Sequence, residues 1–338
     1  MIKLLLRNPK FMTGFLFVFG LFAASVLYAI LFNDHIPVIP LQYTDSGKPV
    51  KPVFSPFEHP PFGTNTLGRD LFFVILVGAK YTLGIAFIVT AGRFLISTMI
   101  GILGETYLSG GFQRFSRIGD AFRYLPATLI SYFILKDLFE HLGFSEKVFV
   151  ELIVLILVAL PVGTQLIADE TRLLYKKAFI EGAKTIGGSK WHILNKHIRP
   201  FLIPQLFIIF ARELTQVLLL LAHLGILTIF IGGVEWKMSW FGQGIPVTLS
   251  GEWAGLIGKS FNSIILTSFQ WIGLVPIFCF TVTILAVRLS IEGMKEVFQT
   301  EPHNLPHKPN QKPVDKKKSP GEEKFTFVRD HSNAYYDS

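Results

Sequence analysis

The sequence predicts an all-α integral membrane protein with six transmembrane helices. Hydrophobic residues make up 50% of the 338 residues and charged residues 17%, whereas soluble domains carry about 25% charged residues. Apolar stretches long enough to cross a bilayer alternate with polar segments. Basic residues gather in some of these segments and are sparse in others, which is typical of a topology signal. We therefore do not interpret the formal net charge of +8 as binding of nucleic acid.

Residues 1–32 are predicted to form a cytoplasmic start and the first transmembrane helix. The start carries Lys3, Arg7 and Lys10, and residues 11–32 contain no charge. At ~1.5 Å per residue this apolar stretch spans about 33 Å, enough for one crossing. A cleaved signal peptide is the alternative, but the stretch is long for one and no A-x-A site ends it.

Residues 33–70 are polar and contain seven prolines. This composition predicts an extracytoplasmic loop with little regular structure. Asp70, at its end, is expected to cap the helix that follows.

Residues 71–292 are predicted to form the core transmembrane domain, with residues 293–338 as a disordered cytoplasmic tail. The remaining five spans are expected at residues 71–104, 124–142, 148–168, 201–232 and 269–289. Six spans place both termini on one side of the membrane, and the density of basic residues places that side in the cytoplasm.

Charged residues inside the spans are candidates for polar contacts. Arg93 is the only arginine in its span, where an unpaired arginine costs about 2.5–3.5 kcal/mol on insertion scales. It should therefore face other helices, water or the interface. Arg212 and Glu213 are adjacent, so they point about 100° apart on a helix and need not pair with each other. They are interpreted either as pore or inter-subunit residues or as partners of a neighbouring helix. Glu213 is the only strong candidate for a buried carboxylate.

Residues 175–200 form a basic island between two apolar blocks, and their chemistry predicts two short helices around a sharp turn. Leu174, Ala178 and Glu181 have the spacing of one helix face. The Gly187-Gly188 pair should end the first helix, because glycine adopts the left-handed conformation that helix ends often need. Ser189 is a plausible N-cap for the second helix.

The same residues resemble the EAA loop of the permease subunits of ABC importers. The match consists of Glu181-Gly182-Ala183, Gly187 four residues later, and Pro200 thirteen residues after that glycine. In that family, the loop contains a coupling helix that sits in a groove of a separate ATPase subunit. Gly182 departs from the family pattern, where alanine is more common.

A second stretch resembles the oligopeptide/dipeptide/nickel branch of this family. Residues 62–70 read FGTNTLGRD and are followed by a Gly-Ala-Lys segment at residues 78–80. They are similar to the branch signature FGTD-x-x-GRD followed by GAR, with Asn65 in place of aspartate and Lys80 in place of arginine.

The resemblance implies a type I ABC importer (MetI-like) transmembrane domain in the cell membrane. It implies a pore formed with a second permease subunit, two ATP-binding subunits, an extracytoplasmic solute-binding lipoprotein, and oligopeptides or dipeptides as substrates. Nickel or another small solute is the alternative. Glu181, Gly182, Ala183, Gly187 and Pro200 would then form the ATPase-coupling site.

The sequence contains no recognisable motif for nucleotide binding, catalysis or metal binding. Residues 182–189 imitate a phosphate-binding loop, but Gly188 stands where the lysine is required. The single cysteine, Cys279, excludes a disulfide within the chain and a cysteine-based zinc site. We therefore expect no catalytic residues, no metal and no cofactor, with ATP bound by partner subunits. A stand-alone secondary transporter or channel, and a membrane scaffold, are the hypotheses of a different class.

Overall fold

The computed structural model describes residues 2–300, apart from residues 44–46, 48, 109–111, 113–118, 120–121, 123, 139–141, 240–241, 243 and 266–268. Within this part, the helices are α1 (Ile2–Leu5), α2 (Pro9–Phe32), α3 (Leu71–Leu103), α5 (Ala127–Leu138), α6 (Phe144–Tyr175), α7 (Ala178–Thr185), α8 (Lys190–His192), α9 (Arg199–Ile226), α10 (Trp253–Ile265) and α11 (Gln270–Thr300). The π-helical turns are η1 (Gly104–Leu108), which extends α3, and η2 (Ile193–Ile198), which leads into α9.

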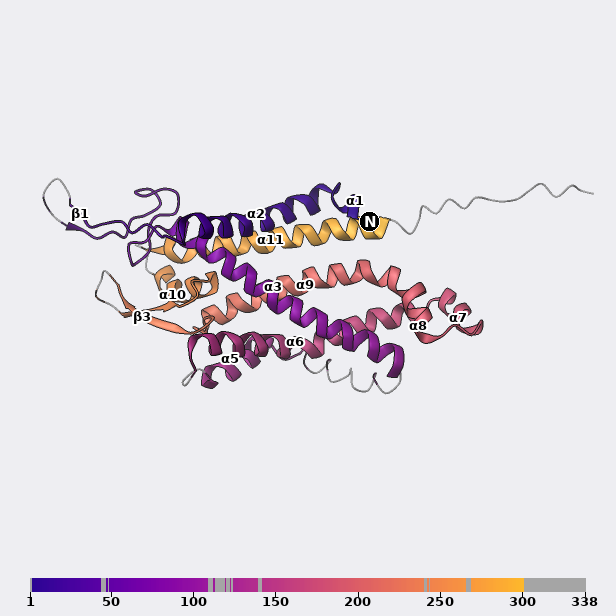
Figure 1. Cartoon of the computed structure of the whole chain (residues 1–338). Coiled ribbons are helices and arrows are strands. Elements are labelled where there is room, and N and C mark those ends of the chain that lie inside the picture. The colour runs from indigo at the N-terminus through magenta and orange to yellow at the C-terminus, as the bar shows by residue number, and fades with distance from the viewer. Residues whose placement is uncertain are drawn as a thin grey trace, which may run out of the picture. The chain divides into compact units, whose positions relative to one another are not determined.

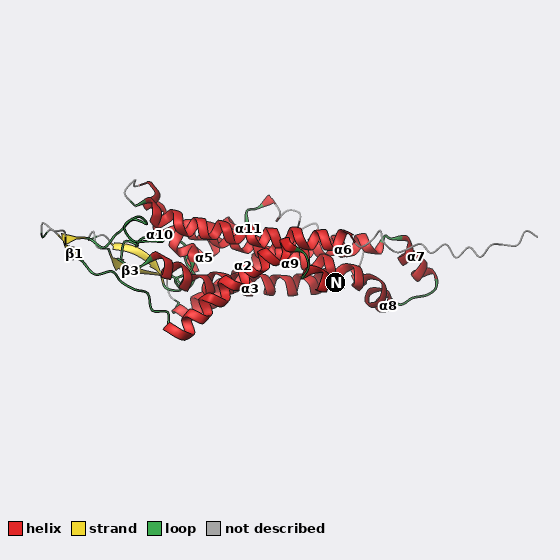
Figure 2. Ribbon diagram, turned by 90° about the horizontal axis from the view of Figure 1, so that it is seen from above, coloured by secondary structure: helices red, strands yellow, loops and turns green. Residues whose placement is uncertain are grey.

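Two small antiparallel hairpins complete the described elements. They pair β1 (Gln42–Tyr43) with β2 (Pro49–Val50), and β3 (Val234–Met238) with β4 (Gly244–Thr248). The hairpins and α10 lie at one end of the helix bundle, and α7 and α8 lie at the other (Figures 1 and 2). We call these the hairpin end and the elbow end.

Five helical stretches in the described residues are long and apolar enough to cross a membrane: Pro9–Phe32, Leu71–Leu108, Phe144–Tyr175, Lys190–Ile226 and Gln270–Phe298. They agree with five of the six predicted spans. The predicted span at 124–142 contains only α5, whose 12 residues reach about 18 Å, short of a hydrocarbon core of about 30 Å. Six spans are therefore not confirmed.

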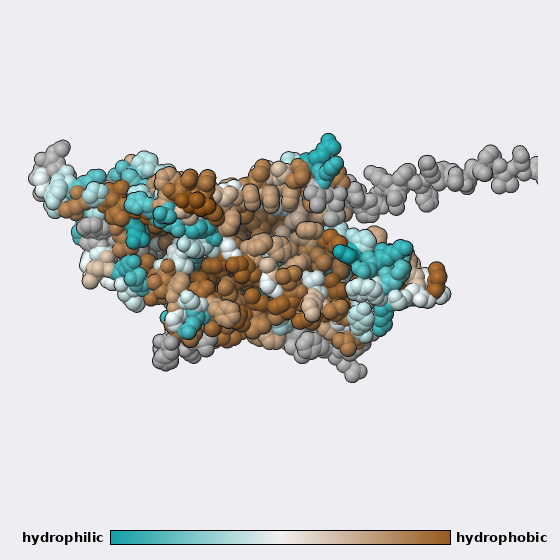
Figure 3. Space-filling view, in the orientation of Figure 1, coloured by the Kyte–Doolittle hydropathy of each residue, from teal (hydrophilic) through white to brown (hydrophobic). Residues whose placement is uncertain are grey.

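Apolar side chains cover the middle of the molecular face in Figure 3, between more hydrophilic ends. Large apolar residues of α2, such as Leu27, Ile30 and Leu31, are exposed. Such a large exposed apolar surface fits contact with lipid and not with water.

α2 lies against α11 because small residues let the two backbones approach. A Cβ atom on Gly14 would come within 2.2 Å of the Ala286 carbonyl oxygen, and one on Gly293 within 2.4 Å of the Phe11 nitrogen. Glu296 then accepts a hydrogen bond from Asn8 at 3.1 Å and forms an ion pair with Lys10. These contacts continue α11 to Thr300, so the tail predicted from residue 293 starts too early. Residues 301–338 lie outside the described part.

The hairpin end is fixed to the bundle through Trp253, which is fully buried at the start of α10. Its backbone N–H donates to the Thr82 hydroxyl at 2.9 Å, and its ring Nε1 donates to the Ile75 carbonyl at 2.8 Å. Asp70 caps α3 as predicted, since its Oδ1 accepts from the Phe72 N–H at 2.8 Å.

Two fully buried carboxylates hold the turn that follows α9, and the expectation that Glu213 is the only strong buried candidate is wrong. The Ile231 N–H donates to Glu252 Oε1 at 3.1 Å, and the Gly232 N–H donates to Glu151 Oε2 at 3.3 Å. The Thr248 and Ser250 hydroxyls also donate to Glu252. The backbone donors are far from both carboxylates in the sequence, 21 residues from Glu252 and 81 residues from Glu151, so no local pattern indicates these contacts.

Burial raises the pKa of the Glu252 carboxyl above its ordinary value of 4.5, while the Ser250 and Thr248 hydrogen bonds oppose the shift. Because the pKa of Glu252 is higher in the folded than in the unfolded protein, the folded state binds the proton more tightly. The resulting stabilisation is complete below pH 4.5 and is lost as the pH rises through the raised pKa. We expect the thermal midpoint of the protein to fall over this window relative to that of Glu252→Gln, which cannot titrate. Parallel pH profiles of the two proteins in detergent would contradict this expectation.

Candidate functional site

Residues 176–198, which we call the elbow, extend from the bundle between α6 and α9. They comprise α7, the turn at residues 186–189, α8 and η2. The two predicted short helices are therefore present, although α7 begins at Ala178, and α6 itself continues to Tyr175. Pro200 lies in the first turn of α9, a position at which proline is common in helices.

The turn of the elbow has the predicted chemistry. Gly187 has φ +87°, a conformation that favours glycine. The N–H of Gly187 donates to the Lys184 carbonyl at 2.9 Å, and that of Gly188 to the Ala183 carbonyl at 3.1 Å, which closes the end of α7. The Ser189 hydroxyl then accepts from the His192 N–H at 3.2 Å, so Ser189 is the N-cap of α8.

A separate apolar cluster gives the elbow a defined shape. Its buried members are Leu174, Ile180, Ile193, Leu194, Ile198 and Leu202, with Ala183 packed beside them. They come from α6, α7, η2 and α9. The buried face of α7 is therefore formed by Ile180 and Ala183. The predicted common face of Leu174, Ala178 and Glu181 is wrong, because the chain turns between α6, which contains Leu174, and α7.

A bidentate ion pair joins the elbow end of α6 to η1. Arg172 donates from Nε to Glu105 Oε1 at 3.0 Å and from Nη2 to Glu105 Oε2 at 2.9 Å. The Tyr175 hydroxyl donates to the Thr106 hydroxyl at 3.2 Å beside it. The sequence analysis did not single out Glu105. The only available signal was its position, directly after a long apolar stretch.

Replacing Arg172 with lysine is expected to lower the free energy of unfolding by about 1–3 kcal/mol, because lysine keeps the charge but cannot bind both oxygens of buried Glu105. The control is Lys176→Gln, an exposed neighbouring position, where a change within about 0.5 kcal/mol is expected. Denaturation of both purified variants measures the difference; equal losses would contradict the role of the ion pair.

The tip of the elbow is exposed and carries apolar side chains as well as charge. Ile186 is 89% exposed, and Phe179 and Trp191 are also exposed. Among the described residues, the Glu181 carboxylate has no hydrogen-bond partner, and a Cβ atom on Gly182 would meet nothing within 4 Å. Exposed large apolar residues around a charge are typical of a surface that a partner covers.

Inside the bundle, Arg93 and Glu213 come together although they are distant in the sequence. Arg93 Nη1 lies 3.9 Å from Glu213 Oε2, and Arg93 Nε donates to the Leu155 carbonyl at 2.7 Å. The contact therefore joins α3, α6 and α9. Arg212 does not take part: it is exposed on another side of α9, so the expectation that the adjacent charges need not pair is confirmed.

A bundle of membrane-length apolar helices, with an exposed elbow at one end, defines a multi-pass membrane protein. Comparison with known proteins finds distant relatives. No family model matches the chain.

The chain is similar to several curated permease proteins. It is 24% identical over 204 residues to the "Probable D,D-dipeptide transport system permease protein DdpC" of Escherichia coli strain K12, covering 60% of this chain and 61% of that protein. It is 21% identical over 234 residues to the glutathione transport system permease protein GsiD of Pectobacterium atrosepticum, covering 69% and 70%. It is 25% identical over 305 residues to a protein of Brucella abortus biovar 1 named as a peptide transport system permease, covering 87% and 88%.

The chain is thus a distant homologue of the permease subunits of peptide- and glutathione-type ABC transport systems, over most of its length. Subunits of this kind are not enzymes.

Proposed function

We propose that the chain is the permease subunit of an ATP-driven importer of short peptides. It forms the translocation pathway with a second permease subunit and is moved by two separate ATP-binding subunits, while an extracytoplasmic lipoprotein delivers the substrate. A peptide substrate is supported by the names of the relatives, which give D,D-dipeptide, glutathione and peptide transport.

The observation that carries the proposal is the elbow: an exposed tip on a rigid, anchored base. A lever must transmit force without bending, and the elbow's own core together with the Arg172–Glu105 ion pair connects α7 to α3 and α6. Movement of the tip would therefore move these two helices, and through Pro200 also α9.

Each predicted coupling residue has a role in this lever. Glu181 presents an unpaired carboxylate to the ATPase, and Gly182 leaves room for close approach of its surface. Ala183 closes the turn through its carbonyl, and Gly187 sets the angle between α7 and α8. Pro200 begins α9.

The charged residues in the spans have different roles in the proposal. Arg93 and Glu213 form an inter-helix contact that keeps α3 and α9 in register. Arg212 is exposed and stands outside this contact. The elbow end is the cytoplasmic end, with both termini inside, because basic residues are dense there.

Vesicle transport with purified components tests the proposal. Vesicles that contain this chain, the second permease and the ATP-binding subunits, supplied with the extracytoplasmic lipoprotein, should accumulate a labelled tripeptide only when ATP is present on the elbow side. Vesicles that contain this chain alone, with or without an ion gradient, should not. Accumulation by the chain alone would favour a stand-alone secondary transporter.

A further inference from the structure

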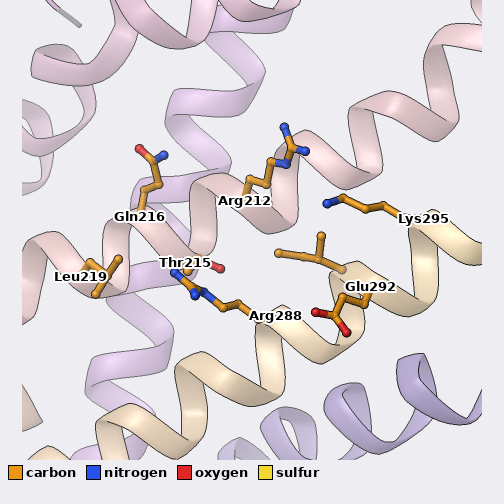
Figure 4. Close-up of a pocket in the computed structure, with 8 residues that line it drawn as sticks. Arg212, Thr215, Gln216, Leu219, Arg288, Glu292 and Lys295 are labelled. Atoms are coloured by element: carbon orange, nitrogen blue, oxygen red, sulfur yellow. The ribbon is translucent and has the colours of Figure 1, made fainter. Parts of the chain in front are cut away.

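A cavity between α9 and α11 carries an excess of positive charge. It has a volume of about 330 Å³ and is lined by Arg212, Thr215, Gln216, Leu219, Arg288, Ile291, Glu292 and Lys295. Figure 4 shows Arg288 and Lys295 extending from α11 toward α9, where Arg212 and Thr215 lie. Three cations thus line the cavity together with one carboxylate, that of Glu292.

The three cations have no partner in the described part of the chain. Among the described residues, no side-chain hydrogen bond or ion pair includes Arg212, Arg288 or Lys295. A cavity lined by three cations and one carboxylate favours an anionic occupant over a neutral one.

Contacts between α2 and α11 fix the depth of the cavity. Lys295 adjoins Glu296, which binds Asn8 and Lys10 at the start of α2. The outer rim of the cavity is therefore level with the beginning of the first apolar span. Arg288 lies seven residues earlier in α11, about 10 Å deeper, a depth at which long basic side chains still reach the headgroup region.

An apolar stripe continues from the cavity along the same face of α11. Leu285 is 57% exposed and Phe278 is 64% exposed, and Leu274 follows them at helical spacing. A charged cavity that leads into an exposed apolar stripe matches the two parts of a phospholipid, with the headgroup among the cations and an acyl chain along the stripe.

We propose that this cavity binds the headgroup of an anionic phospholipid in the leaflet at the elbow end. Basic pockets between transmembrane helices commonly hold such headgroups. The volume is at the small end of the roughly 300–1,000 Å³ of ligand sites, which suits a headgroup better than an oligopeptide. The Arg212, Arg288 and Lys295 side chains contact the phosphate, and the Gln216 side-chain amide donates a hydrogen bond. Only the naming of this leaflet as cytoplasmic rests on the proposed function.

Lipid counting on the purified importer tests the site independently of transport. The delipidated complex containing this chain is titrated with phosphatidylglycerol or phosphatidylcholine, and native mass spectrometry counts the lipids bound. We expect a preference for phosphatidylglycerol, and an affinity about 30-fold weaker in the double variant Arg212→Gln/Arg288→Gln, which loses two basic contacts.

The matched control is Lys3→Gln/Arg7→Gln, which removes two exposed cations at the same end but outside the cavity. The control should keep the preference. Equal binding by both double variants, or no preference for phosphatidylglycerol in the unmodified complex, would overturn the proposal. Displacement of the lipid by millimolar inorganic phosphate or by a tripeptide would also overturn it, because the occupant would then be a soluble anion.

Discussion

Gly187→Val is expected to abolish peptide uptake while leaving the protein inserted in the membrane. Gly187 has φ +87°, and a β-branched residue in this conformation costs of order 1–3 kcal/mol. The turn can relieve this strain only by changing the angle between α7 and α8, which misplaces the exposed tip. Uptake by vesicles of the assembled importer, beside the amount of protein in the membrane, measures the effect.

Gly47→Val is the control for backbone strain alone. Gly47 has φ +75° and open space around it, and it belongs to the hairpin end. This variant should keep its uptake.

Glu181→Lys is a companion to Gly187→Val. It reverses an exposed unpaired charge without changing the fold and should, like Gly187→Val, abolish uptake. Normal uptake by both Gly187→Val and Glu181→Lys would remove the elbow from the mechanism.

The largest loss of stability is expected from Glu213→Ala. This variant leaves Arg93, which is 3% exposed, with the Leu155 carbonyl but without a counter-charge. Removing one partner of a buried ion pair costs about 3–5 kcal/mol, and the 3.9 Å separation favours the lower figure. The double variant Arg93→Met/Glu213→Leu replaces both charges and should recover most of the loss.

Glu235→Ala provides the surface comparison for this prediction. Glu235 pairs with Lys237 at 3.0 Å but is half exposed, so its loss should cost less than about 1 kcal/mol. Chemical denaturation of the four purified proteins in detergent measures the differences. If the double variant were no more stable than Glu213→Ala, the ion pair would not be the reason for the loss.

Features decided by neighbouring residues could be predicted from the sequence. The glycine turn, the Ser189 cap and the Asp70 cap each depend on residues within a few positions. The long apolar helices follow from composition. The end of α11 was misplaced because Glu296 is held by Asn8 and Lys10, and no local pattern indicates that contact.

The polar contacts that position the elbow and the turn after α9 could not be predicted, because their partners are far apart in the chain. Glu105 and Arg172 are 67 residues apart, and Glu151 binds a backbone N–H 81 residues away. A sequence pattern reports helix faces and caps but not which helices become neighbours. The unpaired cations of the cavity depend likewise on the packing of α9 against α11.

Site-specific photo-crosslinking from the elbow tests the central claim most directly. A photoreactive amino acid at Ile186, on the exposed tip, should form an adduct with an ATP-binding subunit in cells that are importing peptide. The same probe at Trp236, which is 70% exposed at the hairpin end, should not. An ATP-binding subunit captured from position 186 alone is the predicted result. Efficient crosslinking from position 186 that never captures such a subunit would contradict the claim that the elbow passes motion from an ATPase to the membrane helices.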